Sequence, residues 1–222
     1  MSKATVAAML EHTDTVLLDM DGALLDLHYD NHFWLCHLPQ RFAEARGLPL
    51  ETARQQLQGR YTALAGTLAW YSVDYWQNEL QLDIMRLKEE VAHLIAVHAG
   101  VSDFLSALRA MGKRLVLATN AHHKSVTLKM ARTGLEAHFD AIITSHSLGF
   151  AKEEQGFWRA LQALEKFAPQ RTMLLDDSLP VLNAARQFGI GQLLCVRRPD
   201  SQQPAKDTTP YAAIDSFVGL IQ

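Results

Sequence analysis

Residues 15–22 read Thr-Val-Leu-Leu-Asp-Met-Asp-Gly, a short apolar run that ends in two aspartates and a glycine. The run does not alternate between apolar and polar residues, which is typical of a strand covered on both faces. Similar apolar runs follow at residues 114–119, 141–145, 172–176 and 192–196. We therefore predict that these runs are the buried strands of one sheet.

Helical patterns separate these strands, and glycines mark where the helices stop. Apolar side chains recur at helical spacing in residues 102–111, 120–133 and 181–188, which are followed by Gly112, Gly134 and Gly189. A glycine just past a helix readily adopts the left-handed conformation that closes it. Alternating strands and helices predict an α/β fold with a doubly wound parallel sheet.

Residues 28–98 interrupt this alternation. They carry long helical patterns at 31–46, 52–68, 69–80 and 84–97 and no strand candidate. We predict a helical insertion after the first strand, so that residues 1–27 and 99–222 form one core and residues 28–98 a smaller unit. The stretch 197–210 is rich in Pro, Asp, Gln and Thr, which favours a surface loop, and a short last helix is expected at 214–221.

The composition is that of an ordinary globular protein, since 48% of the 222 residues are hydrophobic and 20% are charged. A formal net charge of −3 argues against a broadly basic surface, so no nucleic-acid partner is expected. Cys36 and Cys195 have neither metal-ligand nor disulfide-framework spacing. With no signal-peptide pattern and no run long enough to span a membrane, we expect a soluble, cytoplasmic protein.

Polar residues stand where the predicted strands end. In an open parallel sheet, ligands bind beyond the carboxyl ends of the strands. Those positions hold Asp19, Asp21, Thr119, Asn120, Asp176 and Asp177, and Lys152 comes shortly after the strand at 141–145. Carboxylates gathered at one edge repel one another unless a cation joins them, and an oxygen-only ligand set suits Mg²⁺. We therefore expect a magnesium-dependent site at this edge.

These residue types fit the transfer of a phosphoryl group. One carboxylate can act as the nucleophile, and a second, two residues on, can protonate the leaving oxygen and later activate water. Lys152 would supply positive charge and Thr119 a hydroxyl donor. Ordinary structural interpretations compete, because Asp-x-Asp-Gly occurs in many loops and Ser178 can cap a helix. The shared position at the strand ends of one sheet favours an active site.

The order of these motifs resembles that of the haloacid dehalogenase superfamily of phosphohydrolases. The likeness rests on residues 17–22 (Leu-Leu-Asp-Met-Asp-Gly), Thr119-Asn120, Lys152 and residues 174–177 (Leu-Leu-Asp-Asp). It implies that Asp19 is the nucleophile and Asp21 the general acid and base. It further implies that the phosphoryl group is bound by Thr119, Asn120 and Lys152.

The same resemblance implies a metal site and an architecture. Mg²⁺ would be held by Asp19, the backbone carbonyl of Asp21 and Asp176, with Asp177 as a ligand or close by. The family's usual strand order is 5-4-1-2-3, and the helical insertion, here residues 28–98, forms a mobile cap over the site.

Longer stretches resemble the bacterial GMP/IMP nucleotidase branch of this superfamily: residues 30–34, 70–76, 119–122 and 149–153. The likeness implies hydrolysis of purine 5′-nucleotides that carry a 6-oxo base. The expected substrate contacts are Asn31, Phe33, Trp34 and His122. Four further aromatic residues, Trp70, Tyr71, Tyr75 and Trp76, could stack on a purine, but their helical spacing equally fits the core of a small helical bundle.

Two departures from the family pattern leave alternatives open. Ala23 stands where the family commonly has Thr or Val, and Glu153-Glu154 follows the lysine where Pro is common. Asp21 favours a phosphatase over the superfamily's dehalogenases, which typically lack this second aspartate. A sugar-phosphate or phosphoglycolate phosphatase is the alternative enzyme. A catalytically silent relative that binds a phosphorylated ligand is the alternative from another class.

Overall fold

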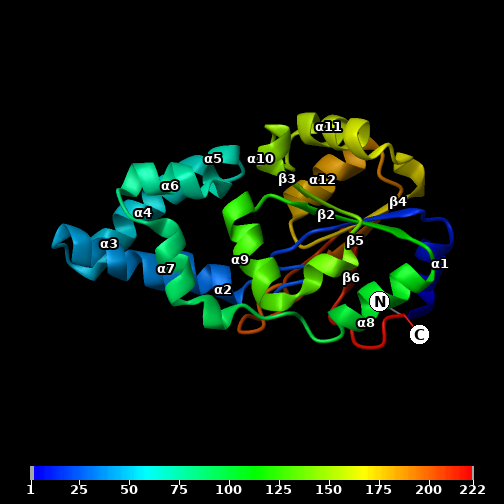
Figure 1. Ribbon diagram of the computed structural model, residues 1–222, viewed down its shortest axis with the longest axis horizontal. Helices are drawn as coiled ribbons and strands as arrows, with labels where there is room; N and C mark the ends of the chain where they lie inside the picture. The colour runs from blue at the N-terminus through cyan, green and yellow to red at the C-terminus, as the bar shows by residue number, and fades with distance from the viewer. Residues whose placement is uncertain (1–2, 222) are drawn as a thin grey trace.

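The computed structural model describes residues 3–221 and is built around one parallel sheet (Figure 1). Its strands are β1 Thr15–Leu18, β2 Arg114–Thr119, β3 Ala141–Thr144, β4 Thr172–Asp176, β5 Gln192–Val196 and β6 Ala212–Ile214. They lie in the order β3-β2-β1-β4-β5-β6, and each neighbouring pair is parallel. The predicted order 5-4-1-2-3 is confirmed, with β6 added beyond β5.

The strand register brings the carboxyl ends of β1, β2 and β4 level with one another. Leu18 pairs with Leu117 of β2 on one side and with Leu175 of β4 on the other. The N–H of Asp19 then donates to the Leu175 carbonyl at 2.9 Å. Side chains that directly follow these strands therefore meet at one edge of the sheet.

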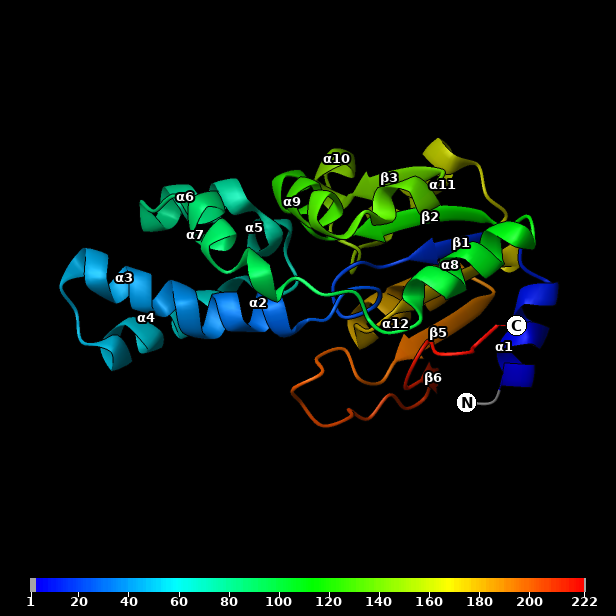
Figure 2. The same cartoon turned by 60° about the horizontal axis from the view of Figure 1, so that its bottom comes forward.

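Each strand sends alternate side chains into two separate cores. Val16 and Leu18 of β1 belong to one core and Leu17 to the other. The first face is covered by α1 Lys3–Glu11, α8 Val101–Ala110 and α9 His123–Thr133, and the second by α11 Gln155–Glu165 and α12 Leu179–Phe188 (Figure 2). This double coverage is why the strand sequences are apolar throughout.

The prediction of a short last helix at residues 214–221 is wrong. Ala212–Ile214 instead forms β6, because the open edge of β5 offers unpaired backbone groups, and Leu194 pairs with Ala212 there. The chain then turns, and Phe217 packs against Phe104 of α8 with ring centroids 5.2 Å apart. A strand this short has no sequence pattern that distinguishes it from a loop.

The helix expected at 120–133 begins only at His123. His122 is its N-cap, and Nδ1 of His122 accepts a hydrogen bond from the N–H of Lys124 at 3.4 Å. Asn120 and Ala121 are thereby left in the loop that follows β2.

Between β1 and α8 the chain forms a separate helical lobe, residues 28–98, which we call the cap. Its helices are α2 His28–His32, η1 Phe33–His37, α3 Leu38–Arg46, α4 Leu50–Leu64, α5 Leu68–Tyr71, α6 Val73–Leu80, α7 Ile84–Glu90 and η2 Ala92–Leu94. The first three run on without a break, through a π-helical turn at η1, and end at Gly47, whose φ is +62°. The predicted helices are therefore present, with shifted ends.

The cap has an aromatic core of its own. Trp34, Tyr61, Trp70 and Trp76 surround one another with ring centroids 5.2–5.8 Å apart. Phe33 is fully buried beside them. This cluster gives the small lobe a rigid interior.

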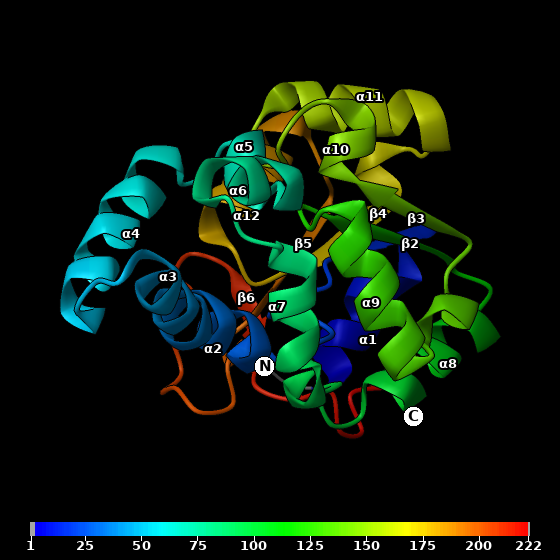
Figure 3. The ribbon, with the colours of Figure 1, turned by 60° about the vertical axis from the view of Figure 1, so that its left-hand side comes forward.

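Two linkers join the cap to the sheet, and they lie side by side (Figure 3). The N–H of Asp26 donates to Ala96 at 2.9 Å, and the N–H of His98 donates to Leu24 at 3.0 Å. The division into two domains, a core of residues 1–27 and 99–222 and a cap of residues 28–98, stays a prediction.

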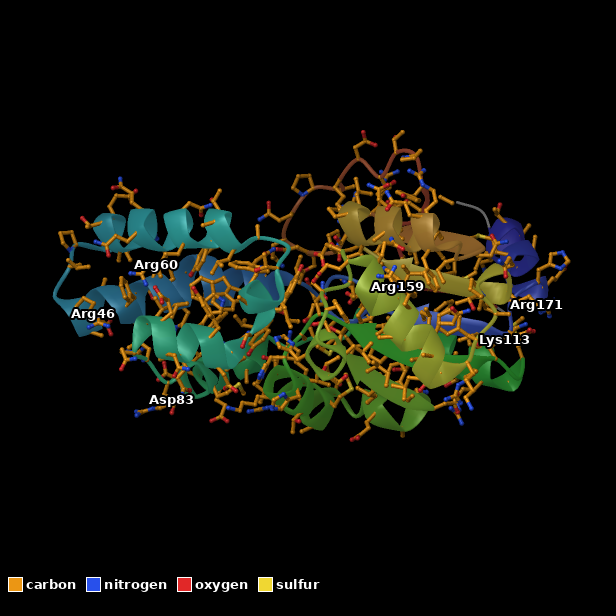
Figure 4. The ribbon with its side chains drawn as sticks, turned by 90° about the horizontal axis from the view of Figure 1, so that it is seen from above. Arg46, Arg60, Asp83, Lys113, Arg159 and Arg171 are labelled. Atoms are coloured by element: carbon orange, nitrogen blue, oxygen red, sulfur yellow. The ribbon has the colours of Figure 1, made fainter. Side chains whose placement is uncertain are left out.

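The molecule is elongated along the line that joins cap and core. Figure 4 shows Arg46 and Arg60 on the cap, with Lys113 and Arg171 at the opposite end. Within residues 3–221, none of the helices has the length and apolar character needed to cross a membrane.

Candidate active site

The ammonium group of Lys152 lies between two carboxylates at the end of the sheet. Its Nζ is 2.7 Å from Asp19 Oδ1 and 2.6 Å from Asp176 Oδ2. Burial works to lower the pKa of Lys152, but these two carboxylates outweigh it and raise that pKa. Burial also raises the pKa of the Asp19 carboxyl, and Lys152 opposes this rise. The site thus holds a buried nucleophile candidate beside a permanent cation.

Three carboxylates are placed to hold a metal ion. Asp19, Asp176 and Asp177 each offer an oxygen atom, and these atoms lie within 4.8 Å of one another. The donors are all oxygens, which fits Mg²⁺. Asp176 already uses one oxygen for Lys152 and the other for the N–H of Ser178, at 2.8 Å. Asp177 uses Oδ2 for Lys206, at 2.9 Å.

Gly22 makes room for Asp177. The glycine has φ +82°, and a Cβ at this position would lie 2.9 Å from Cγ of Asp177. A side chain here would be strained and would push the carboxylate away. The glycine of the Asp-x-Asp-Gly motif thus has a packing role in the acidic cluster.

The loop after β2 supplies two polar residues next to Lys152. Asn120 Oδ1 accepts a hydrogen bond from the N–H of Lys152 at 2.9 Å. Thr119 is buried, and its Oγ1 accepts from the N–H of Ala121 at 3.0 Å. Thr119 and Asn120 therefore belong to the same rigid corner as the lysine.

A single cavity brings these groups together. Its core side contains every residue predicted to be catalytic, phosphate-binding or metal-binding: Asp19, Asp21, Thr119, Asn120, Lys152, Asp176 and Asp177. Its cap side includes Asn31, Trp34, Trp70, Tyr71 and Lys88. The cap therefore covers the carboxyl edge of the sheet.

Of the four residues expected to contact the substrate, three line the cavity and one does not. Asn31, Trp34 and His122 line the cavity. Phe33 is fully buried in the cap core, so it belongs to the packing of the lobe and not to the cavity wall. Trp76 is likewise fully buried.

Glu153 and Glu154 replace the family's usual proline with hydrogen bonds. Glu154 Oε1 accepts from the N–H of Ala151 at 2.9 Å, which closes the turn before α11. Glu153 accepts from Nδ2 of Asn120 at 3.0 Å and from the hydroxyl of Tyr71 at 2.6 Å. Glu153 therefore connects the loop after β2, which we call the phosphate-side loop, to the cap.

A haloacid dehalogenase-like hydrolase family model matches residues 13–189. The chain belongs to this family. The range includes the strand-end aspartates, Lys152 and the cap. The family resemblance inferred from the motifs is confirmed.

Curated relatives of this haloacid dehalogenase-like hydrolase are phosphatases. The chain is 37% identical over 211 residues to the GMP/IMP nucleotidase YrfG of Escherichia coli, with 95% of each chain covered. It is 24% identical over 226 residues to the phosphoglycolate phosphatase of Nitrosococcus oceani, with 96% of each covered. The protein is therefore a phosphatase enzyme.

Solved structures of low sequence identity support the fold. A HAD phosphatase from Thermococcus onnurineus matches with a TM-score of 0.77 at 21% identity, covering 94% of this chain and 96% of the other. The L-2-haloacid dehalogenase PA0810 matches with a TM-score of 0.60 at 18% identity, covering 94% and 97%. Phosphatases and dehalogenases share this architecture, so the side chains at the site, and not the fold, determine the reaction.

In this haloacid dehalogenase-like hydrolase, the side chain of Asp21 faces α9. Its Oδ1 accepts a hydrogen bond from Nζ of Lys129 at 2.6 Å. Burial raises the pKa of Asp21 to about 6, Asp30 adds to the rise, and Lys129 opposes it. A carboxyl group that titrates near neutrality is suited to both giving and taking a proton.

The surroundings of His122 favour the uncharged form of its ring. Burial lowers the pKa of His122 to about 4, and His123 and His146 add to the effect. Its Nε2 lies 3.6 Å from Asp74 of the cap. The ring thus lines the cavity as an uncharged group.

Three lysines around the site have no signal in the sequence. Lys129 and Lys88 line the cavity, and Lys206 reaches the backbone carbonyl and carboxylate of Asp177 from the loop after β5. Lys129 lies 108 residues along the chain from its partner Asp21. Lys206 lies 29 residues from its partner Asp177. Only the tertiary fold reveals these pairs.

Proposed function

We propose that the protein is a Mg²⁺-dependent phosphomonoesterase that acts through a phospho-Asp19 intermediate on purine 5′-nucleotides with a 6-oxo base. The observation that carries the proposal is the placement of Asp19, held beside Lys152 at the end of a cavity that the cap covers. The nucleotide class is supported by the similarity to the GMP/IMP nucleotidase, which extends over 95% of both chains.

In the first half of the reaction, a carboxylate oxygen of Asp19 attacks phosphorus and the bond to the nucleoside 5′-oxygen breaks. Asp21 gives its proton to that oxygen. In the second half, Asp21 takes a proton from water and the water oxygen attacks phosphorus. The bond from phosphorus to Asp19 breaks, which frees the Asp19 carboxylate and releases inorganic phosphate. Lys152, Thr119 and Asn120 hold the phosphoryl oxygens throughout.

The metal ion would be held by Asp19, Asp177 and the backbone carbonyl of Asp21, with Asp176 adjacent. We favour Asp177 over Asp176 as the direct ligand, because both Asp176 oxygens already accept hydrogen bonds from Lys152 and Ser178. When bound, Mg²⁺ would offset the repulsion among the carboxylates and the phosphoryl group.

The cavity wall favours a neutral, flat group beyond the phosphate. Leu27, Trp34, Trp70, Val73 and Val181 give it apolar and aromatic surface. The lysines that line it are each paired, Lys88 with Asp30, Lys129 with Asp21 and Asp30, and Lys152 with Asp19 and Asp176. A nucleoside needs no further cation, whereas the carboxylate of phosphoglycolate would have to compete for one.

A small phosphometabolite is the second candidate, because the similarity to a phosphoglycolate phosphatase extends over 96% of this chain. A catalytically silent ligand-binding protein is a weaker candidate, which hydrolysis of p-nitrophenyl phosphate with Mg²⁺, lost on adding EDTA, would exclude. A cytoplasmic setting and a small-molecule partner are part of the proposal.

A panel of phosphomonoesters tests the substrate class. Initial rates with Mg²⁺ should be higher for GMP and IMP than for sugar phosphates and phosphoglycolate by about tenfold or more in kcat/KM. AMP, which carries a 6-amino group, is the control for base recognition. Equal rates across the panel, or a preference for phosphoglycolate, would contradict the nucleotide assignment.

A further inference from the structure

Four charged side chains form a continuous series of ion pairs between core and cap. Nζ of Lys129, on α9, lies 2.6 Å from Asp21 Oδ1 and 2.6 Å from Asp30 Oδ2. Nζ of Lys88, on α7, lies 3.1 Å from the other oxygen of Asp30. Asp21 and Lys129 belong to the core and Asp30 and Lys88 to the cap, so the series crosses the boundary between the lobes.

Burial makes Lys129 dependent on both of its carboxylate partners. Its side chain is only 2% exposed, and an ammonium group withdrawn from water is strongly unfavourable unless it is paired. Asp30 in turn accepts from two ammonium groups, one on each of its oxygens. The position of Lys129 is therefore set by groups from both lobes.

The cap end of the series is held rigidly. Nζ of Lys88 lies 4.5 Å from the centroid of Phe33 and 5.4 Å from that of Trp34, within cation–π range of both rings. These rings belong to the aromatic core of the cap or pack against it. Asp30 is thus fixed to the cap and moves with it.

We propose that Lys129 is a positioning residue for Asp21, and that Asp30 makes this positioning depend on closure of the cap. The inference rests on the proposed function, in which Asp21 protonates the leaving oxygen. Lys129 holds one oxygen of Asp21, which fixes the orientation of the carboxyl and leaves its other oxygen for the substrate. When the cap opens, Asp30 leaves, and Lys129 keeps only one of its two partners.

This arrangement couples the acid to enclosure of the substrate. Lys129, and with it Asp21, is held in this position by groups of both lobes only when the cap covers the cavity. A simple role in phosphate binding or in packing would instead affect every phosphomonoester alike. The two kinds of role therefore differ in how the rate depends on the leaving group.

The test compares Lys129→Met with the wild type on a nucleoside 5′-monophosphate and on p-nitrophenyl phosphate. The nitrophenolate ion leaves without a proton, whereas the nucleoside oxygen needs one. We expect kcat/KM to fall about 100-fold for the nucleotide and only a few-fold for p-nitrophenyl phosphate. Asp30→Asn, which leaves Lys129 and Asp21 intact, should show the same selectivity with a smaller loss.

The matched control is Lys124→Met. Lys124 also lies on α9 and also pairs with a cap aspartate, Asp74, at 2.5 Å, but it does not contact Asp21. It should slow both substrates equally and slightly. Circular dichroism and thermal unfolding establish that each variant is folded.

Two results would overturn the proposal. One is an equal loss on both substrates in Lys129→Met, and the other is wild-type selectivity in a folded Asp30→Asn. If the wild type hydrolyses neither an alkyl nor an aryl phosphate, the proposed function fails and this inference fails with it. Wild-type turnover with an unchanged substrate ratio in Lys129→Met removes only the inference.

Discussion

Lys152 organises the site through both its backbone and its side chain. Its N–H is held by Oδ1 of Asn120, while its Nζ contacts Asp19 and Asp176. One residue thus fixes the loop after β2, the end of β1 and the end of β4. Nothing local in the sequence marks it, since an isolated lysine is usually exposed. Its place between Thr119-Asn120 and Asp176-Asp177 in the order of the motifs is the signal that predicts it.

His122 gives the fold an acid-sensitive element. The folded protein keeps its ring neutral down to about pH 4, whereas in the unfolded chain it takes up a proton below about pH 6.5. Acid therefore favours the unfolded state, and stability should fall as pH drops between these values. His122→Asn can still cap α9 but does not titrate, so its free energy of unfolding should fall less steeply over this range.

Urea unfolding across that pH range measures the effect. The exposed His12→Asn is the control and should keep the wild-type slope. If His122→Asn had the same pH dependence as the wild type, burial of the neutral ring would not be the cause.

At the scale of elements, α5 closes the cap against the phosphate-side loop. The hydroxyl of Tyr71 donates to Glu153, and Glu153 accepts from Asn120. Burial raises the pKa of the Tyr71 hydroxyl, and Glu153 adds to this, so the group stays a donor. A cap helix is thereby linked to a residue that we assign to phosphate binding.

Tyr71→Phe should weaken this contact without removing the ring from the cavity wall. Loss of one hydrogen bond to a charged acceptor predicts a decrease of about tenfold in kcat/KM for the nucleotide, mainly through KM. Tyr75→Phe is the control, because Tyr75 lies on the neighbouring helix α6 and does not line the cavity. Steady-state kinetics decides, and an equal effect in both variants would contradict a role for the Tyr71–Glu153 bond.

Elements with strong local patterns were predictable, and those stabilised only by distant contacts were not. The continuous apolar runs gave the buried strands because both sheet faces are covered, and glycines marked the helix ends. β6 was missed because its formation depends on the open edge of β5. Phe33 was misplaced because position near the hinge does not say whether a side chain faces the cavity or the cap core. The pairing of Lys129 with Asp21 spans 108 residues and has no local trace.

The whole molecule consists of a sheet that carries the groups proposed to react and a helical cap that covers the cavity they line. The linkers pair with each other between Leu25 and Val97, so the cap is attached at one narrow place. Its contacts with the core are polar at Asp30, Tyr71 and Asp74. Contacts of this kind can break and re-form without exposing an apolar core, which suits a cap that has to admit a substrate and release products.

In the proposed mechanism, Asp19 is the residue that takes up the phosphoryl group. A rapid acid quench with the best substrate, labelled at its phosphate, should leave the label on the wild-type protein as an acyl phosphate that alkali releases. Asp19→Asn should carry no label and lose turnover on the order of a thousandfold or more, with an unchanged circular dichroism spectrum. Label retained in Asp19→Asn, or turnover close to that of the wild type, would contradict the account.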